Sequence, residues 1–336
     1  MTRFIAAVAF VYSAAAQTPV VGDINLYGLH KIAPARILSA IEVKTGAPLP
    51  PSKGEMEDTL DKIPGVVNAR VEAVCCDGPR VSLFIGIEER GAAHAAFRSD
   101  PVGDATLPSE LLDQYRGFVA AVGRAAGKGN AAEDLTAGHS LMADPEARAF
   151  QQQFQTFAGA HLEDLRNVLR NGSEAEQRAV AAAVIDYADS KKGIVDDLQY
   201  ALQDPDESVR ANAARSLMAI AILGSKQPAL GIHISPTWFI QLLNSVVLSD
   251  RLESAKVLLT LTDSPNATVL EQLREQALPS LVEMARWKTP RYALPSFLLL
   301  GRLAGLTDGQ VRQNWEKEDR EAVIEKALNP GGRKRG

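Results

Sequence analysis

The residues best suited to chemistry lie in one segment between two predicted helices. Glu133, Asp134 and His139 are side chains of the types that serve as metal ligands or as a general acid and base. A metal site needs three or four converging ligands, however, and the five histidines of the chain are scattered. Gly138-His139-Ser140 also lacks the second glycine of a nucleophile elbow. We therefore expect a hydrogen-bonded loop and no enzymatic activity, metal or cofactor. An enzyme or enzyme-accessory protein with a site near Glu133 to His139 is the alternative.

Two adjacent cysteines, Cys75 and Cys76, account for both thiols of the chain. Neighbouring residues of a strand point to opposite faces, and a disulfide between them would close a strained ring. We therefore expect no disulfide framework. Either the two form a redox-active or intermolecular pair, or they are small side chains that end a strand, which is the interpretation we favour.

The two strands around these cysteines give the clearest secondary-structure signal. Apolar residues recur at every second position over residues 67–73 and again over residues 81–87. Asp77-Gly78-Pro79 lies between the runs. Its glycine tolerates positive φ and its proline cannot donate to a central ladder, so a tight turn is expected there. The sequence predicts a hairpin.

Composition and charge limit the classes of partner. The chain has 336 residues, of which 46% are apolar and 23% charged, as in an ordinary globular protein. Its formal net charge is -5. Phosphate binding needs clustered Lys and Arg, so we expect no nucleic-acid partner. The one basic cluster, residues 333–335, belongs to a predicted solvated tail at residues 330–336.

The first 16 residues have the features of a cleaved signal peptide. Arg3 supplies the positive charge, residues 4–12 are apolar, and Ala14-Ala15-Ala16 offers the small residues that a signal peptidase requires. The alternative is the first strand or helix of a cytosolic fold. No later stretch reaches about 18 uninterrupted apolar residues, so we expect no membrane span. We therefore expect a secreted or periplasmic protein.

Residues 20–90 predict a strand, two helices and the hairpin. Pro34 suits the first turn of one helix, and Ser52 with Glu55 has the spacing of a capping box for the next. This order resembles the polypeptide-transport-associated (POTRA) domain. The residues that carry the resemblance are Gly28, Gly46, Leu49, Ile63-Pro64-Gly65-Val66 and Glu88-Glu89. The resemblance implies an extracytoplasmic α+β module that binds other polypeptides, often by adding a strand to its sheet edge.

The strand at residues 66–74 is the candidate edge. If the last strand pairs with both others, this strand lies outermost and leaves backbone groups unpaired. Its outward side chains, Asn68, Arg70 and Glu72, could equally protect the edge, and the sequence leaves both possibilities open. The predicted partner-binding residues are Val67, Asn68, Ala69, Arg70, Val71 and Glu72.

The rest of the chain is predicted to be helical. Residues 91–106 read as a linker, and residues 107–159 as a helical connector whose first helix stops at Gly127. A further helix is expected to begin at Asp144-Pro145 and to continue to Leu169. Residues 306–329 read as one C-terminal capping helix.

Residues 160–305 contain weakly repeated units, each a turn between two short helices. The clearest unit has Asp204 in the turn and Arg210 six positions later; the upstream copy has Asn171 and Arg178, and a later copy has Lys256. The pattern resembles HEAT repeats of α-solenoids. That resemblance implies that Asp204 and Arg210 form a ladder tying one turn to the next, and that the concave face docks proteins. Related repeats occur in bilin lyases, which underlies the enzyme-accessory alternative.

Trp287, Tyr292 and Phe297 are read as core residues rather than as a binding surface. Taken together, the sequence predicts an α+β POTRA-like domain (β-α-α-β-β) followed by an all-α HEAT-like solenoid. The expected function is that of an exported, non-enzymatic adaptor or assembly factor. Its partners would be other polypeptides, whose identity the sequence leaves open along with the oligomeric state.

Overall fold

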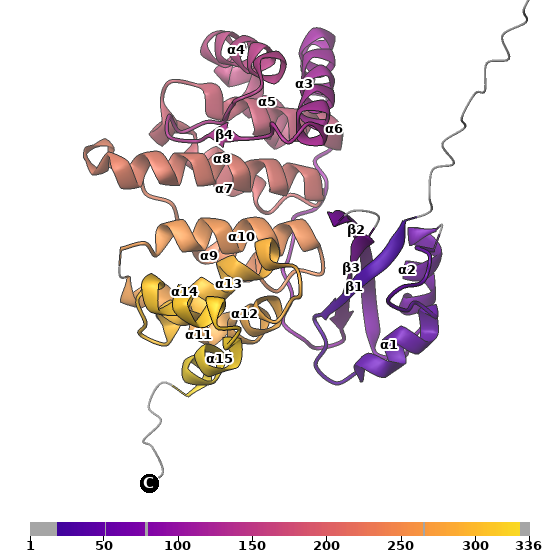
Figure 1. Cartoon of the computed structure of the whole chain (residues 1–336). Helices are drawn as coiled ribbons and strands as arrows, with labels where there is room; N and C mark the ends of the chain where they lie inside the picture. Colours follow the sequence, from indigo (N-terminus) through magenta and orange to yellow (C-terminus); the bar gives the residue numbers. More distant parts are fainter. Residues whose placement is uncertain (1–18, 51, 78–79, 265, 330–336) are drawn as a thin grey trace, which may run out of the picture.

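The computed structural model describes residues 19–50, 52–77, 80–264 and 266–329. A small sheet with two helices is followed by a long array of helices (Figure 1). The predicted signal peptide, the hairpin residues Gly78 and Pro79 and the basic tail lie outside the described residues, as do the side chains of Cys75 and Cys76.

The N-terminal unit has the order of elements that the sequence predicts. These are β1 (Val20–Tyr27), α1 (Pro34–Ile41), α2 (Lys53–Asp61), β2 (Val66–Asp77) and β3 (Arg80–Glu89). The central strand β3 pairs parallel with β1 and antiparallel with β2. The two strands of the predicted hairpin are therefore confirmed, and β2 lies at an edge of the sheet. The POTRA resemblance itself stays a prediction.

Both faces of β3 are buried. Leu83 and Ile85 face α1 and α2, in a core that also contains Ile37, Leu60 and Val71. Helix α2 is held at its start by Ser52, whose hydroxyl accepts a hydrogen bond from the Glu55 amide at 3.1 Å. Phe84 points the other way and belongs to the core of the helical array.

Residues 91–108 contain no helix or strand, yet they are held along the helical array. The Arg98 amide donates to the Gln203 carbonyl at 2.8 Å, and the Gly103 carbonyl accepts from the Ser173 amide at 3.1 Å. The segment predicted as a linker therefore lies against the helices by backbone hydrogen bonds.

Helix α3 (Ser109–Gly127) ends at the glycine expected to stop it. A two-residue hairpin, β4 (Glu133–Asp134) and β5 (Leu141–Met142), precedes α4 (Pro145–Ala160) and α5 (Leu162–Asn171). The single helix predicted from Asp144 to Leu169 is wrong, because the chain breaks at His161, with φ −128° and ψ 34°. Gly159 is a poor helix former, and the break directs both Phe154 and Leu165 into the core.

The remaining helices stack in chain order (Figure 1). They are α6 (Ala175–Val184), α7 (Lys191–Ala201), α8 (Glu207–Lys226), α9 (Thr237–Leu242), α10 (Leu248–Leu261), α11 (Ala267–Gln276), α12 (Leu278–Ala285) and α13 (Pro290–Leu303), with short 3-10 turns η1 (Ile185–Tyr187) and η2 (Pro228–Leu230). Two helices end the described chain, α14 (Asp308–Glu316) and α15 (Arg320–Leu328). The prediction of one capping helix was wrong: the chain turns at Glu318, where φ is 59°.

The sheet packs on the helical array with the face opposite α1 and α2 (Figure 1). The Trp287 ring lies 5.6 Å from that of Tyr27 and 5.0 Å from that of Phe84, both in edge-on geometry. Tyr292 contacts Phe84 in the same way at 5.5 Å. Trp287 and Phe297 are buried, as predicted. Trp287 and Tyr292 also form the surface of the helical array on which the sheet packs.

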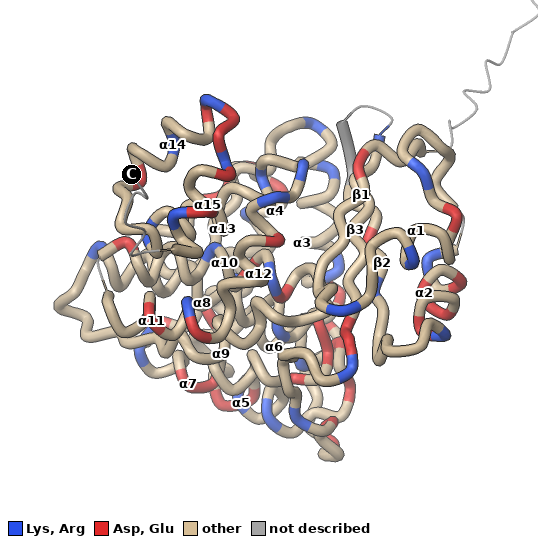
Figure 2. Tube along the Cα trace, turned by 90° about the horizontal axis from the view of Figure 1, so that it is seen from below, with Lys and Arg blue, Asp and Glu red and all other residues tan. Residues whose placement is uncertain are grey.

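Charges of both signs are interspersed along the chain in the view of Figure 2, rather than separated by sign. Within the described residues, the structure has no helix with the length and apolar character needed to span a membrane.

Candidate functional site

A row of buried arginines runs along the turns that join the helices of each pair. Arg178 binds both carboxylate oxygens of Asp204 at 2.9 Å. One repeat further, Arg210 binds Asp250 in the same two-pronged way, at 2.9 and 2.8 Å. Each guanidinium also donates to two carbonyls of its own turn. Asp204 and Arg210 thus take part in two successive links, and the Asp204 carbonyl accepts from Arg210 at 2.8 Å.

The row continues in α10, where the sequence pattern is weakest. Arg251 donates to Glu283 at 3.2 Å and to the Ser245 carbonyl at 2.6 Å. Burial lowers the pKa of Arg251, while Glu283 opposes the shift. Burial raises the pKa of Asp250, and the hydrogen bond from Arg210 counteracts that rise. The row therefore depends on tightly paired, desolvated charges.

The N-terminal part of the chain covers this arginine row at three points. Asp100 lies 3.3 Å from Arg178, and the Phe97 ring lies 3.9 Å from the Arg210 guanidinium carbon. The Tyr27 ring lies 4.7 Å from the Arg251 guanidinium carbon, and the Tyr27 hydroxyl donates a hydrogen bond to the Val246 carbonyl at 2.9 Å. The arginine row therefore lies inside the molecule, where β1 and the segment that follows β3 shield it from solvent.

The predicted edge residues lie on β2, and some of their outward backbone groups already have partners. The Val71 amide donates to the Glu57 carboxylate of α2 at 2.8 Å, which shows that this amide points away from β3. The Ala69 carbonyl accepts from the Arg70 guanidinium at 3.2 Å. Lys53 pairs with Glu72 at 2.5 Å. Side chains of the unit itself therefore protect part of the edge, and Val67 is 54% exposed.

A cavity of about 610 Å³ lies beside β2, between the sheet and the array. Asn68 and Arg70 line it from β2, His94 and Phe97 from the following segment, and Val246 from the turn before α10. A second hollow of about 410 Å³, which includes Glu72 and Val74, lies further along the strand. Space for a polypeptide is therefore present next to the protected edge.

Glu133 and His139 do not converge on one reacting point. Glu133 accepts from Ser140 at 2.7 Å and from Arg215 at 2.9 Å. His139 is buried, and its Nδ1 lies 3.1 Å from the Lys191 ammonium. Burial, together with the Lys191 charge, lowers the pKa of His139 to about 4. The imidazole is therefore neutral near pH 7 and accepts a hydrogen bond from Lys191. This arrangement suits a structural role for both residues.

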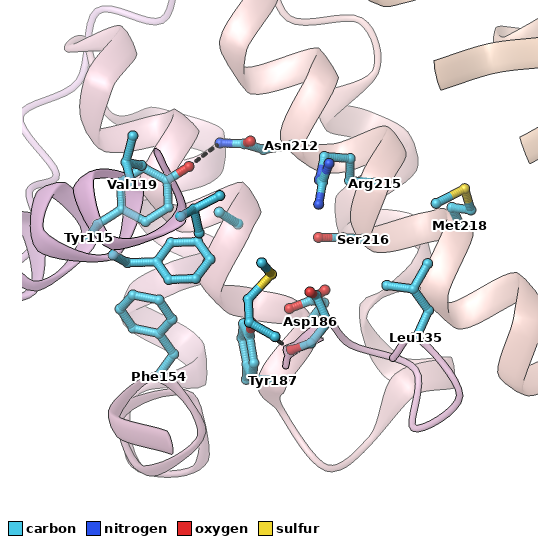
Figure 3. A pocket seen from close by; sticks show the side chains of 15 residues that line it. Tyr115, Val119, Leu135, Phe154, Asp186, Tyr187, Asn212, Arg215, Ser216 and Met218 are labelled. Carbon is cyan, nitrogen blue, oxygen red and sulfur yellow. Dashed lines mark hydrogen bonds between the residues drawn. The ribbon is translucent and has the colours of Figure 1, made fainter. Parts of the chain in front are cut away.

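A cavity that the sequence did not indicate is lined in part by Leu135, Ser140 and Met142, from the β4–β5 hairpin. Its volume is about 200 Å³. The rings of Tyr115 and Phe154 lie on one side of it, and Arg215, Ser216 and Asp186 on the other (Figure 3). The available sequence signal was a single carboxylate within the apolar run of residues 179–188.

Asp186 is the unusual residue of this cavity. It is 4% exposed, and its Oδ1 has no hydrogen-bond partner among the described residues. Burial raises the pKa of Asp186 to about 7, although Lys191 acts in the opposite direction. Buried polar atoms are normally paired, so an orphaned carboxylate oxygen at a cavity indicates a group that the protein alone does not satisfy.

Comparison with known proteins bears on one part of the chain. Residues 162–230 match the family model described as HEAT repeats. This match supports the HEAT-like interpretation across α5 to α8, where the Arg178–Asp204 link and Arg210 lie. Comparisons with curated proteins and with solved structures gave no match for this chain. Residues 162–230 are thus similar to HEAT repeats, which typically act as protein-interaction scaffolds.

Proposed function

We propose that this protein is an exported, non-enzymatic scaffold that docks other polypeptides, as an adaptor or assembly factor. HEAT repeats at residues 162–230 support the scaffold role. The signal-like first 16 residues motivate the export, and N-terminal sequencing of the mature chain, with a start near Gln17 expected, tests it. An unprocessed N-terminus would contradict this part of the proposal.

The observation that carries the docking proposal is the edge strand β2 beside an open cavity. An extended peptide can add to such an edge through main-chain hydrogen bonds, while its side chains enter the adjacent space. The Val71 amide points outward, and backbone groups alternate along an antiparallel strand, so the amides of Ala69 and Ala73 point outward too. These groups, with the POTRA resemblance of residues 20–90, favour strand addition.

Glu57 has a specific part in this proposal. Its carboxylate occupies the Val71 amide, and an incoming strand would have to displace it. Glu57 is a partly exposed side chain of α2 and takes no part in the backbone pairing of β2 with β3, so it can move away without disturbing that ladder. We therefore propose that Glu57 prevents non-specific pairing at the β2 edge until a partner strand competes for the Val71 amide.

The test uses the full chain with a photo-crosslinking amino acid at Asn68, which lines the cavity. Ala69→Pro removes one outward amide and is expected to abolish polypeptide adducts at that position. Glu57→Ala frees the Val71 amide and is expected to increase them. Ala93→Pro, at an exposed position after β3, serves as the proline control.

Adducts that persist unchanged in the Ala69→Pro protein would refute docking at the edge. Circular dichroism of each variant establishes that the sheet remains folded. If Ala69→Pro unfolds the sheet, Glu57→Ala alone tests the proposal. A Glu57→Ala protein that gives no more adducts than the wild type would contradict the role assigned to the Val71 amide.

A further inference from the structure

The 200 Å³ cavity around Asp186 has the composition of a ligand site rather than of a packing defect. Tyr115, Phe118 and Phe154 form a continuous aromatic wall, with ring centroids 5.6 to 6.2 Å apart. Polar groups gather on the opposite side, from η1 and α8 (Figure 3). A few convergent polar groups in a mostly apolar concave site are typical of small-molecule pockets.

The carboxylate of Asp186 lacks a hydrogen-bonded cation within the described residues. Three charged side chains face it: Lys191 from α7, Arg215 from α8 and Glu133 from β4. The Lys191 ammonium donates to the Asp186 and Ala188 carbonyls and lies against His139. Arg215 is bound to Glu133. Both cations are therefore engaged elsewhere, and Oδ1 of Asp186 remains without a partner.

The mouth of the cavity is open to solvent near α3. Val119 lines the cavity and is 52% exposed. Val119, Tyr115 and Asn212 also line an adjoining groove between α3, α6 and α8, with a volume of about 760 Å³. A ligand can therefore enter from the groove and reach the buried carboxylate without unfolding the helices.

We propose that this cavity binds a primary ammonium group on a short apolar stem, with Asp186 as its counter-ion. An ammonium is a compact cation that can reach the unpartnered Oδ1 with a single N–H donor, whereas a guanidinium binds a carboxylate best through a planar two-pronged fork. The aromatic wall receives the stem, and its ring faces favour a nearby cation. At about 30 Å³ per water-sized unit, the cavity holds a ligand of roughly seven non-hydrogen atoms.

Two sources can present this group: a free amine, or a lysine side chain of a polypeptide lying in the adjoining groove. Benzylamine represents the first source and N-acetyl-lysine methylamide the second. The ε-acetylated form of the latter keeps the stem but lacks the charge. Calorimetric titration of the purified full chain in phosphate buffer compares them, because Tris is itself a primary amine.

Benzylamine is expected to bind at least tenfold more tightly than benzyl alcohol, which has the same shape without the charge. Asp186→Asn keeps the side-chain shape and is expected to weaken benzylamine binding at least tenfold. Asp189→Asn, the same change at an exposed position three residues on, is expected to leave it unchanged. Ala183→Leu fills the cavity while keeping Asp186, and is expected to abolish binding.

The pH dependence provides an independent readout. The amine stays protonated between pH 6 and pH 8, whereas Asp186, with its pKa near 7, loses its proton over this interval. Affinity for benzylamine is therefore expected to rise about tenfold from pH 6 to pH 8 in the wild type and to stay level in Asp186→Asn.

No binding of either amine, equal binding of benzyl alcohol, or undiminished binding by Asp186→Asn would each overturn the proposal. Tighter binding of the lysine analogue than of benzylamine, lost on ε-acetylation, assigns the site to a polypeptide lysine. The reverse preference assigns it to a free amine. Neither result depends on the β2 edge, so this proposal and the docking proposal can fail separately.

Discussion

At the scale of single residues, Asp186 shows how burial changes the chemistry of a carboxylate. The side chain sits at the end of an apolar helix, beside a cavity, with one oxygen unpaired within the described chain. Desolvation penalises its charged form, so the folded protein holds the proton up to a higher pH than the unfolded chain does. The same property that makes Asp186 suitable for a cation makes it costly to stability when it is ionised and unoccupied.

This cost predicts a measurable pH dependence of stability. The pKa of Asp186 rises from 3.8 to about 7 on folding, so its contribution to stability is full below pH 4 and is lost as the pH rises to 7. The wild-type free energy of unfolding should fall by roughly 2–4 kcal/mol over this window relative to Asp186→Asn. Lys191, Arg215 and Glu133 are present in both proteins, so the comparison reports on Asp186 together with its effect on Lys191, whose pKa burial lowers and the Asp186 charge raises. Urea denaturation at pH 4, 5.5, 7 and 8 measures it.

Asp189→Asn is the control, and it should follow the wild-type curve because Asp189 is exposed. Parallel curves for the wild type and Asp186→Asn across the whole range would show that Asp186 is ionised throughout, and would contradict the argument.

At the scale of elements, the arginine row ties one helix pair to the next. A helix pair cannot bury its apolar faces alone, and stacking creates the core, but apolar faces by themselves can slide. The two-pronged bonds of Arg178 and Arg210 have fixed geometry, and both arginines are almost fully buried. Such pairs fix how neighbouring repeats sit, because a misplaced repeat would leave a buried charge unpaired.

Arg210→Ala is therefore expected to lower the free energy of unfolding by about 3–5 kcal/mol, since among the described residues Asp250 would keep only Ser245 as a hydrogen-bonded side-chain partner. Arg215→Ala, five residues on in the same helix, breaks an exposed pair with Glu133 and should cost at most about 1 kcal/mol. Chemical denaturation of both variants tests the contrast. Similar losses for the two would mean that burial does not govern this link.

How much of these elements the sequence revealed depended on whether the signal was local. The alternation of residues 67–73 and the stop at Gly127 are local patterns, and both predictions agree with the structure. The break at His161 depends on which side chains the distant core accepts, so the continuous apolar period concealed it. The partner of Arg210 is Asp250, 40 residues away, and no spacing rule within one repeat identifies it.

The candidate sites also divide into features with a local sequence signal and features that depend on distant parts of the chain. The edge position of β2 could be inferred from the order of strands, but its protection by Glu57 could not, because helix and strand meet only in the folded unit. The cavity at Asp186 combines α3, the hairpin, α4, η1 and α8, which are brought together by stacking. Only the lone carboxylate in an apolar run was visible in the sequence.

At the scale of the whole molecule, the sheet and the helical array form one body joined by close contact. Gly28 donates its amide to the Glu283 carboxylate at 3.0 Å with φ at 76°, a conformation that favours glycine. The Lys288 amide donates to the Asn25 side chain at 3.1 Å. The Tyr27 ring also covers the Arg251 guanidinium. Separating the sheet from the helical array would therefore expose the arginine row to solvent.

Gly86 of β3 lies where the sheet closely approaches the turn before α10. A Cβ there would lie 2.5 Å from the Val246 carbonyl oxygen and 2.6 Å from the Tyr27 ring, so either the sheet or the turn must shift. Gly86→Ala is expected to cost about 1–3 kcal/mol in the free energy of unfolding. It should also speed amide hydrogen exchange in residues 97–103 and in the turns next to the arginine row, because the shielding loosens.

Gly54→Ala provides the matched control for this prediction. Gly54 lies in α2 with no atom near its Cβ position, so the same substitution should stabilise the protein by about 0.5–1 kcal/mol through helix propensity. Faster exchange confined to β3 after Gly86→Ala, with the arginine row unaffected, would mean that the sheet is not what shields the row. Suppose instead that Gly86→Ala speeds exchange both in β3 and next to the arginine row, while Gly54→Ala speeds it in neither. This result would establish that packing of the sheet and order in the repeats are coupled.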